Sequence, residues 1–197
     1  MSDRATTLKE QPGGVVPAVI HDLLSLESLF AAEEQWCMER IRVLRELAAA
    51  GIHDAQGGWP ESVHWSWAQK ATSCKPSRLE ALGDVRLFGV EATGRWQALL
   101  FGLCEGHGTR LGTRNRPLVY VDFIETAPWN WDIAPLGKVG RYRGAGIQLM
   151  ALAVRWSGAL GYQGRIGLHA LPQAQVFYEQ RCGMQNLGPD VNYHNLC

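Results

Sequence analysis

The chain has 197 residues, of which 46% are hydrophobic, and its 19 basic residues balance its 19 acidic ones. A chain of this length can bury the core of one domain, and its neutral net charge does not favour a nucleic-acid partner. No apolar run reaches the ~18 residues of a membrane helix, and the start lacks a signal-peptide pattern. The cysteines are too irregularly spaced to predict a disulfide framework: Cys37, Cys74, Cys104, Cys182 and Cys197. We therefore expect a cytoplasmic protein without a membrane partner.

The first twenty residues are polar and are interrupted by Pro12, Gly13 and Gly14. This composition is typical of mobile chain ends, so residues 1–20 are predicted to form a flexible N-terminal arm. The remaining residues, 21–197, are then expected to form a single domain.

Helical periodicity dominates the next part of the sequence. Apolar residues recur at three- and four-residue steps from Leu23 to Ala48, and Gly51 follows as a stop signal. This pattern predicts one long helix or two consecutive ones. After a loop at 57–60, Ser62 is the predicted N-cap of a further helix.

Strand-like segments follow in the middle of the chain. Residues 85–91 and 96–103 are separated by Thr93-Gly94, which predicts a β-hairpin. A loop over 105–117 leads to a β-branched and aromatic run at 118–125, which should end near Thr126 because Pro128 follows. The order of elements predicts a mixed α/β fold.

A glycine-containing turn, Arg-Tyr-Arg-Gly-Ala-Gly at 141–146, separates this strand from an amphipathic helix at 147–160. Such a turn offers unpaired N–H groups and the positive end of a helix dipole, which suit a pyrophosphate. It lacks the lysine of a P-loop and the glycine spacing of a dinucleotide site. Lys138, Arg141 and Arg143 are predicted to face phosphate, whereas the basic residues of the 105–117 loop are expected to be solvated: Arg110, Arg114 and Arg116.

The pattern Arg-x-x-Gly-x-Gly resembles the signature of the GNAT superfamily, the acyl-CoA-dependent N-acyltransferases. The order of the following segments is also similar to that superfamily, with a strand-like 164–171, then Phe177-Tyr178-Glu179 and Cys182-Gly183-Met184. The resemblance covers about residues 118–188. It implies a mixed central sheet flanked by helices, and it places the pyrophosphate of coenzyme A on six residues: Arg141, Tyr142, Arg143, Gly144, Ala145 and Gly146.

The resemblance also implies an activity, the transfer of an acetyl group from acetyl-CoA to a primary amine within a ternary complex. In that fold the pantetheine arm pairs with the strand before the glycine turn, which implicates Ile124 and Thr126. Glu125 is the candidate base and Asp122 its competitor. Strand alternation places these two carboxylates on opposite faces unless a bulge intervenes, and a plain ion-pair role for Glu125 stays open.

Tyr178 matches the tyrosine that many members place near the coenzyme sulfur, so it is the candidate acid for the leaving thiolate; a packed core tyrosine is the alternative. Trp65 and Trp67 are candidates for the roof of the acceptor pocket, again by resemblance. Cys104 and His107 alone do not make a metal site, so no metal is expected, and His169 is predicted to be buried.

The acceptor is expected to be a small-molecule or peptide amine. After Met184 a short edge piece at 193–196 closes the sheet, or a partner chain does so in a homodimer. The second interpretation of the whole chain is a non-catalytic acyl-CoA sensor or assembly protein with the same fold.

Overall fold

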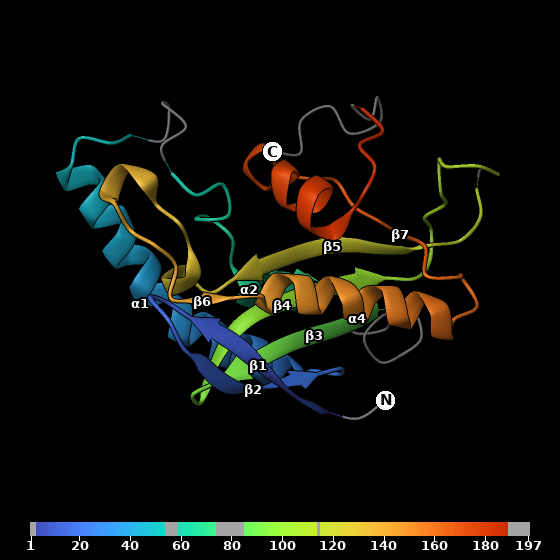
Figure 1. The fold of residues 1–197 in the computed structure, drawn as a ribbon, viewed down its shortest axis with the longest axis horizontal. Coiled ribbons are helices and arrows are strands. Elements are labelled where there is room, and N and C mark those ends of the chain that lie inside the picture. The colour runs from blue at the N-terminus through green and yellow to red at the C-terminus, as the bar shows by residue number, and fades with distance from the viewer. Residues whose placement is uncertain (1–2, 54–58, 74–84, 114, 189–197) are drawn as a thin grey trace.

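A seven-stranded sheet with helices on both faces organises the protein (Figure 1). The structure, a computed structural model, describes residues 3–53, 59–73, 85–113 and 115–188. The strand order is β6-β1-β2-β3-β4-β5-β7, and neighbouring strands are antiparallel except for the parallel pair β5–β7. The strands are β1 (Arg4–Glu10), β2 (Val15–His21), β3 (Val85–Ala92), β4 (Arg95–Leu103), β5 (Val119–Thr126), β6 (Tyr142–Arg143) and β7 (Ile166–Gly167).

The N-terminal residues form a hairpin in this sheet, so the prediction of a flexible arm over residues 1–20 is wrong. Strand β1 pairs with β2 from Arg4 opposite Ile20 to Lys9 opposite Val15. Leu8, only 1% exposed, packs with Ile20 in the core. The Pro-Gly-Gly segment at 12–14 lies between the two strands instead of marking a free end. The sheet therefore begins at Arg4, before the expected domain start at residue 21.

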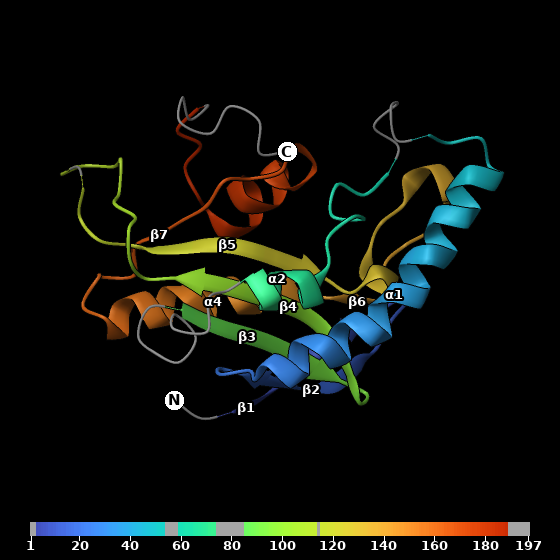
Figure 2. The same ribbon diagram turned by 180° about the vertical axis from the view of Figure 1, so that it is seen from behind.

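Helices α1 (Leu26–Ala49) and α2 (Trp67–Ser73) cover one face of the sheet (Figure 2). The prediction of a long N-terminal helix is confirmed, and Ser25 caps it by accepting a hydrogen bond from the Ser28 N–H. The predicted cap of the second helix is wrong in position, because the Ser66 hydroxyl, not Ser62, accepts from the Gln69 N–H at 3.2 Å.

Helix α4 (Ala145–Ala159) packs on the opposite face, as the periodicity predicts. Its buried side chains include Leu149, Leu152 and Trp156. Gly102 of β4 makes room for the Trp156 ring, since a Cβ there would lie 2.9 Å from it. The predicted β3–β4 hairpin is confirmed, with Thr93 and Gly94 both at positive φ.

The C-terminal part departs from the expected strand and helix. Only Ile166 and Gly167 pair with β5, so the strand expected over 164–171 is short. Two short helical segments follow, Pro172–Ala174 and Phe177–Arg181, the second with π-helical geometry. The edge piece expected at 193–196 lies outside the described residues. Within the described chain no helix is both long enough and apolar enough to span a membrane.

Candidate functional site

The second half of β5 has an open edge. Strand β7 pairs only with Val119 and Tyr120, and no described strand accompanies β5 beyond them on that side. The Ala127 N–H donates to the Gln97 carbonyl, so Thr126 and Ala98 form a non-hydrogen-bonded pair of the β4–β5 ladder. The backbone N–H groups of Thr126 and, by alternation, Ile124 therefore point toward the open edge. An extended ligand can add there as a strand would.

A β-bulge at Asp122 changes which residues of β5 share a face. Phe123 pairs with Phe101, whereas Val121 pairs with Gly102, so Asp122 is the extra residue. Val121 packs in the core under α4, and Phe123 packs with α1 and α2. The negative charges of Asp122 and Glu125 thus both raise the pKa of the Lys70 ammonium of α2. The placement of these two carboxylates on opposite faces, expected for a regular strand, does not apply.

Glu125 lies in the core between β5, α1 and α2 and is 4% exposed. Its Oε2 accepts hydrogen bonds from Arg40 Nη2 at 3.1 Å and from Trp67 Nε1 at 2.7 Å. Its Oε1 has no hydrogen-bond partner within the described chain. Burial raises the pKa of Glu125 to about 7, although Arg40, Trp67, Ser62 and Lys70 all lower it. The Glu125 carboxyl group is therefore present in both its protonated and its ionised form near neutral pH.

Arg40 and Lys70 complete this side of the site, and the sequence analysis missed both. Arg40 occupies a buried position of α1 between Trp36 and Val43, and its Nη1 donates to Glu33 Oε1 at 3.0 Å. An arginine within the apolar stripe of a helix was the available signal for a buried ion pair. Lys70 carried no comparable signal, because its surroundings depend on how α2 packs against β5.

The Lys70 ammonium sits against two aromatic rings. Its Nζ lies 2.9 Å from the centroid of the Phe123 ring and 4.3 Å from that of Trp65, and the two rings meet edge to face at 5.3 Å. Burial lowers the pKa of Lys70 to about 8, against the opposite effect of Glu125 and Asp122. Trp65 is half-buried beside this group, whereas Trp67 is fully buried behind Glu125.

The glycine turn leads directly into α4. Gly144 has φ +97°, which favours glycine, and no side chain caps the helix. The amides of Arg141 and Tyr142 are engaged by the Trp129 carbonyl and Asn130 Oδ1. Those of Gly144, Ala145 and Gly146 have no acceptor within the described residues. The anion-binding donors therefore lie in the second half of the turn.

The basic side chains around the turn each contact a carboxylate. Arg141 pairs with Glu10 at 3.0 Å, Arg143 pairs with Asp132, and Lys138 pairs with Glu46. The three cations predicted to face phosphate thus make exchangeable surface ion pairs. Tyr142 instead packs in the core, and its strand β6 pairs with β1 through Glu10 and Lys9.

Tyr178 is buried in the π-helical segment beside α4, with the Phe177 ring 5.2 Å away. Burial raises the pKa of Tyr178 above its usual range, and Cys182 adds to this. Gly146 allows α4 and this segment to approach closely, because a Cβ there would meet the Phe177 ring at 3.3 Å.

The histidines near β5 do not form a metal centre. The described residues contain no group of three or more His, Cys, Asp or Glu side chains that could hold a metal. His107 stacks on Tyr120 at 4.0 Å, and the Tyr120 hydroxyl lies 2.6 Å from His169 Nδ1. The prediction of a buried His169 is wrong, since the short β7 leaves it exposed.

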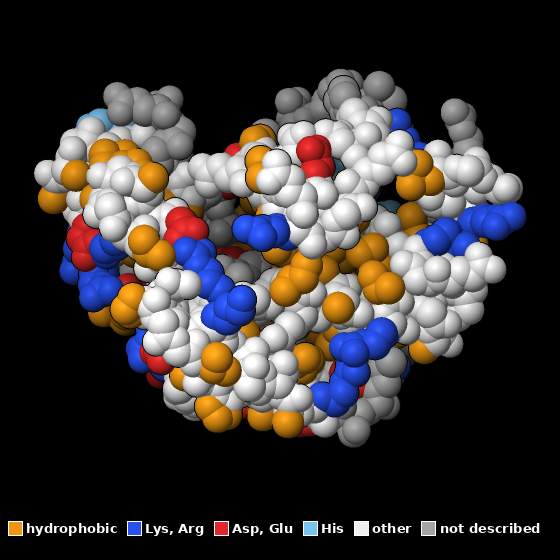
Figure 3. All heavy atoms as spheres, viewed as in Figure 1, with side chains coloured by type: hydrophobic (Ala, Val, Ile, Leu, Met, Phe, Trp, Pro, Cys, Tyr) orange, Lys and Arg blue, Asp and Glu red, His pale blue; other side chains and the backbone are white. Residues whose placement is uncertain are grey.

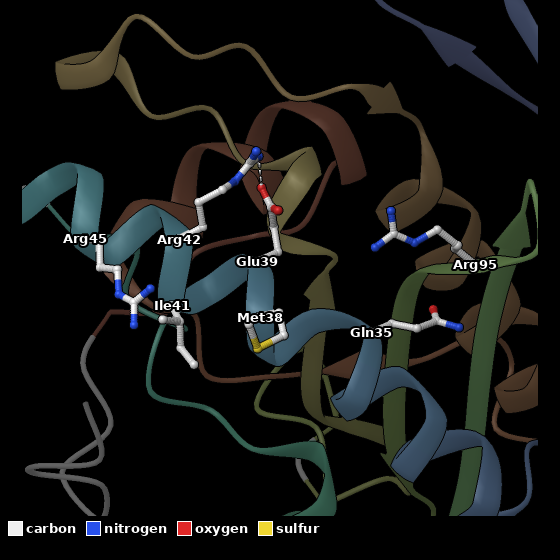
Figure 4. Close-up of a pocket in the computed structure, with 7 residues that line it drawn as sticks. All are labelled: Gln35, Met38, Glu39, Ile41, Arg42, Arg45 and Arg95. Atoms are coloured by element: carbon white, nitrogen blue, oxygen red, sulfur yellow. Dashed lines mark hydrogen bonds and ion pairs between the residues drawn. The ribbon is translucent and has the colours of Figure 1, made fainter.

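Two hollows mark the surface. In the space-filling view the molecule is hollowed between the segment leading into α4 and the C-terminal helical segment, with Lys and Arg side chains on both sides (Figure 3). A separate hollow of about 390 Å³ lies on the outer side of α1 and is lined by Gln35, Met38, Glu39, Ile41, Arg42, Arg45 and Arg95. There Arg42 bends toward Glu39 (Figure 4), and no residue is shared with the glycine turn or β5.

Comparison of the sequence with protein-family models and with curated proteins finds no match. Solved structures do match. Aminoglycoside N-acetyltransferase AAC(6')-Iy in complex with CoA aligns at a TM-score of 0.52 and 17% identity over 94% of this chain and 99% of that one. AAC(6')-IG from Acinetobacter haemolyticus aligns at 0.51 and 15% identity over 87% and 94%. Glucosamine-6-phosphate N-acetyltransferase from Arabidopsis thaliana aligns at 0.50 and 14% identity over 88% and 95%.

These neighbours are acetyltransferases of the GNAT superfamily, and the chain has their fold. The mixed central sheet flanked by helices, expected from the resemblance around the glycine turn, is confirmed.

Proposed function

We propose that the protein is an N-acetyltransferase that transfers the acetyl group of acetyl-CoA to a primary amine, with both substrates bound at once. The observation that carries the proposal is the open edge of β5 together with the uncapped N-terminus of α4. One accommodates an extended pantetheine arm and the other a pyrophosphate. Coenzyme-bound structures of the same fold support this assignment, as does one of AAC(6')-Iy with a bisubstrate analogue of CoA and an acetylated neamine.

The coenzyme would be held mostly by backbone groups. The N–H groups of Ile124 and Thr126 would pair with the pantetheine amides, and those of Gly144, Ala145 and Gly146 would bind the pyrophosphate. Arg141 and Arg143 would exchange their carboxylate partners for phosphate oxygens, while Tyr142 anchors the turn in the core.

Glu125 is the proposed base. A carboxyl with a pKa near 7 and a free Oε1 can accept a proton from the acceptor ammonium, directly or through a water. Asp122 remains the competitor, because the bulge turns it toward the same side and burial raises its pKa as well.

Tyr178 is the proposed acid. Its raised pKa keeps the phenol protonated at any working pH. A thiol has a pKa of about 8.5, so full proton transfer from this phenol to the thiolate is unfavourable. The phenol would therefore assist the departure of the thiolate by donating a hydrogen bond to the sulfur as its negative charge develops.

Calorimetric titration of the purified chain with acetyl-CoA, CoA and ATP tests the coenzyme site. We expect binding of both coenzymes and none of ATP, because only the coenzymes carry a pantetheine arm for the β5 edge. Equal binding of ATP, or no binding of either coenzyme, would contradict a coenzyme site at the glycine turn and leave the turn with a structural role.

The second candidate is a non-catalytic acyl-CoA sensor. The observation in its favour is that Glu125 is already engaged by Arg40 and Trp67 while Tyr178 is buried. A panel of small-molecule and peptide amines separates the two functions, since a sensor binds acetyl-CoA but releases no CoA with any of them.

A further inference from the structure

Lys70 places a primary amine of the chain itself beside the proposed reaction centre. Its Nζ lies over the Phe123 ring at 2.9 Å and near Trp65, and the carboxylates of Asp122 and Glu125 act on it. Aromatic faces and carboxylates are the groups that bind an alkylammonium ion. The chain thus holds its own amine in surroundings suited to a cationic acceptor.

The amine of Lys70, a residue of α2, packs against Phe123 in the stretch of β5 whose edge is open. Phe123 contacts Lys70 through its ring, and Glu125 interacts with it through its charge. These two residues alternate along β5 with Ile124 and Thr126, whose amides face the open edge. A thioester oriented by those amides would lie within one residue of the Lys70 site. Such proximity replaces a bimolecular encounter with an intramolecular one.

We propose that the protein acetylates itself at Lys70. The inference rests on the proposed function, because acetyl-CoA bound along β5 supplies the acyl group. The ammonium first gives one proton to Glu125, and the neutral Nζ then attacks the thioester carbonyl. The C–N amide bond forms, the C–S bond breaks, and the second nitrogen proton passes to the coenzyme thiolate. The products are acetyl-Lys70, CoA and one proton.

The charge environment of Lys70 supports its reactivity. Burial lowers its pKa to about 8, so far more of it is neutral at pH 7 to 8 than of a lysine with the usual pKa of about 10.4. The charged groups facing it are Asp122 and Glu125 of β5 and Arg40 of α1. Lys138, by contrast, is ion-paired with Glu46, and its labelling rate is the internal comparison.

The test is incubation of the full chain with isotopically labelled acetyl-CoA, followed by peptide mapping of all its lysines: Lys9, Lys70, Lys75 and Lys138. We expect label on Lys70 at least tenfold faster than on Lys138, at a rate independent of protein concentration. Lys70→Arg should abolish this labelling, whereas Glu34→Gln, at an exposed position of α1, should leave it unchanged. An excess of CoA should suppress it by competition for the coenzyme site.

Chemical acetylation from solution gives the opposite results and would overturn the proposal. Label would then spread over the lysines, or would appear on Lys70 equally fast with excess CoA. It would also appear equally fast in a Gly144→Glu variant, whose carboxylate would repel the pyrophosphate at the start of α4. The proposal also fails alone if the protein binds acetyl-CoA and acetylates an external amine while Lys70 stays unlabelled. If no coenzyme binds in the titration, both the proposed function and this inference fail. Failure of the inference alone is therefore distinguishable from failure of the proposed function.

Discussion

Glu125 is a carboxyl group on which burial and polar partners act in opposite directions. Burial raises its pKa, while Arg40 and Trp67 lower it through an ion pair and a hydrogen bond, and the result is about 7. A base whose pKa matches the working pH combines a populated ionised form with a useful affinity for protons. The arrangement is therefore suited to catalysis and costs stability when the group ionises.

The first prediction concerns the pH dependence of the rate. The rate at low acceptor concentration should rise with pH with a midpoint near 7, as Glu125 ionises. Glu125→Gln should lower it by about 10²–10⁴-fold and remove this midpoint, while coenzyme affinity stays the same. Measurement with two acceptor amines of different pKa separates the ionisation of the enzyme from that of the substrate.

The exposed Glu34 on the same helix as Arg40 offers a control, and Glu34→Gln should behave like the wild type. A Glu125→Gln variant that keeps the midpoint near 7 would remove Glu125 from the role of base.

The second prediction concerns stability. The folded pKa of Glu125 lies above its unfolded value of 4.5, so its contribution is fully present below pH 4.5 and is lost as pH rises through about 7. The free energy of unfolding of the wild type should therefore fall relative to that of Glu125→Gln between these pH values. Urea unfolding at several pH values measures this, and parallel curves would show that the carboxyl group titrates normally.

The third prediction uses two glycines. A Cβ at Gly140 would overlap the Asn130 carbonyl, whereas one at Gly158 of α4 meets nothing within 4 Å. Gly140→Ala should destabilise by about 1–3 kcal/mol or more, because backbone must move. Gly158→Ala should stabilise by about 0.5–1 kcal/mol, since alanine loses less backbone entropy in a helix. Equal effects in urea unfolding would contradict the close approach of residue 140 to residue 130.

At the scale of elements, the N-terminal hairpin supports the glycine turn. Strand β6, which contains Tyr142 and Arg143, pairs only with β1 among the described strands, through Glu10 and Lys9. The position of the proposed phosphate site therefore depends on residues that composition alone assigned to a mobile arm.

The fourth prediction tests this support. Leu8→Ala should cost about 2–5 kcal/mol, because it removes a fully buried side chain of β1. Coenzyme affinity should fall with it, since β6 loses its anchor. Val15→Ala in the same hairpin, at a position 64% exposed, should change stability by no more than about 0.5 kcal/mol. Normal stability and affinity in Leu8→Ala would mean that the hairpin does not support the site.

Local patterns predicted the elements whose signals are local. The periodicity of α4, the strand at β5 and the turn at Gly144 could all be read because spacing, β-branching and glycine act within a few residues. The hairpin was missed because Pro12, Gly13 and Gly14 outweighed the flanking β-branched residues. The bulge at Asp122 arises from pairing with β4, and the surroundings of Lys70 arise from packing, so neither is visible in one segment.

At the scale of the whole molecule, the two helical layers are joined through the sheet on which the proposed coenzyme site lies. The cluster under α4 and the cluster under α1 and α2 share β3, β4 and β5. A ligand bound along β5 and the start of α4 would therefore contact elements from both halves of the core.

The fifth prediction follows from this position. A coenzyme present at 100 times its Kd should add about 2.7 kcal/mol to the free energy of unfolding, because it binds only the folded chain. For a protein of this size, that corresponds to a rise in Tm of roughly 5–10 °C. A thermal melt with CoA beside one with ATP measures the effect, and equal shifts would point to non-specific phosphate binding.

The pairing of β1 with β6 also bears on biosynthesis. Strand β1 finds its outer partner only when residues 142 and 143 have left the ribosome, on the order of ten seconds after β1 itself. During that interval the outer edge of β1 is unpaired and open to other nascent chains. The glycine turn therefore gains the edge that holds it only after β2, β3, β4 and β5 have been synthesised.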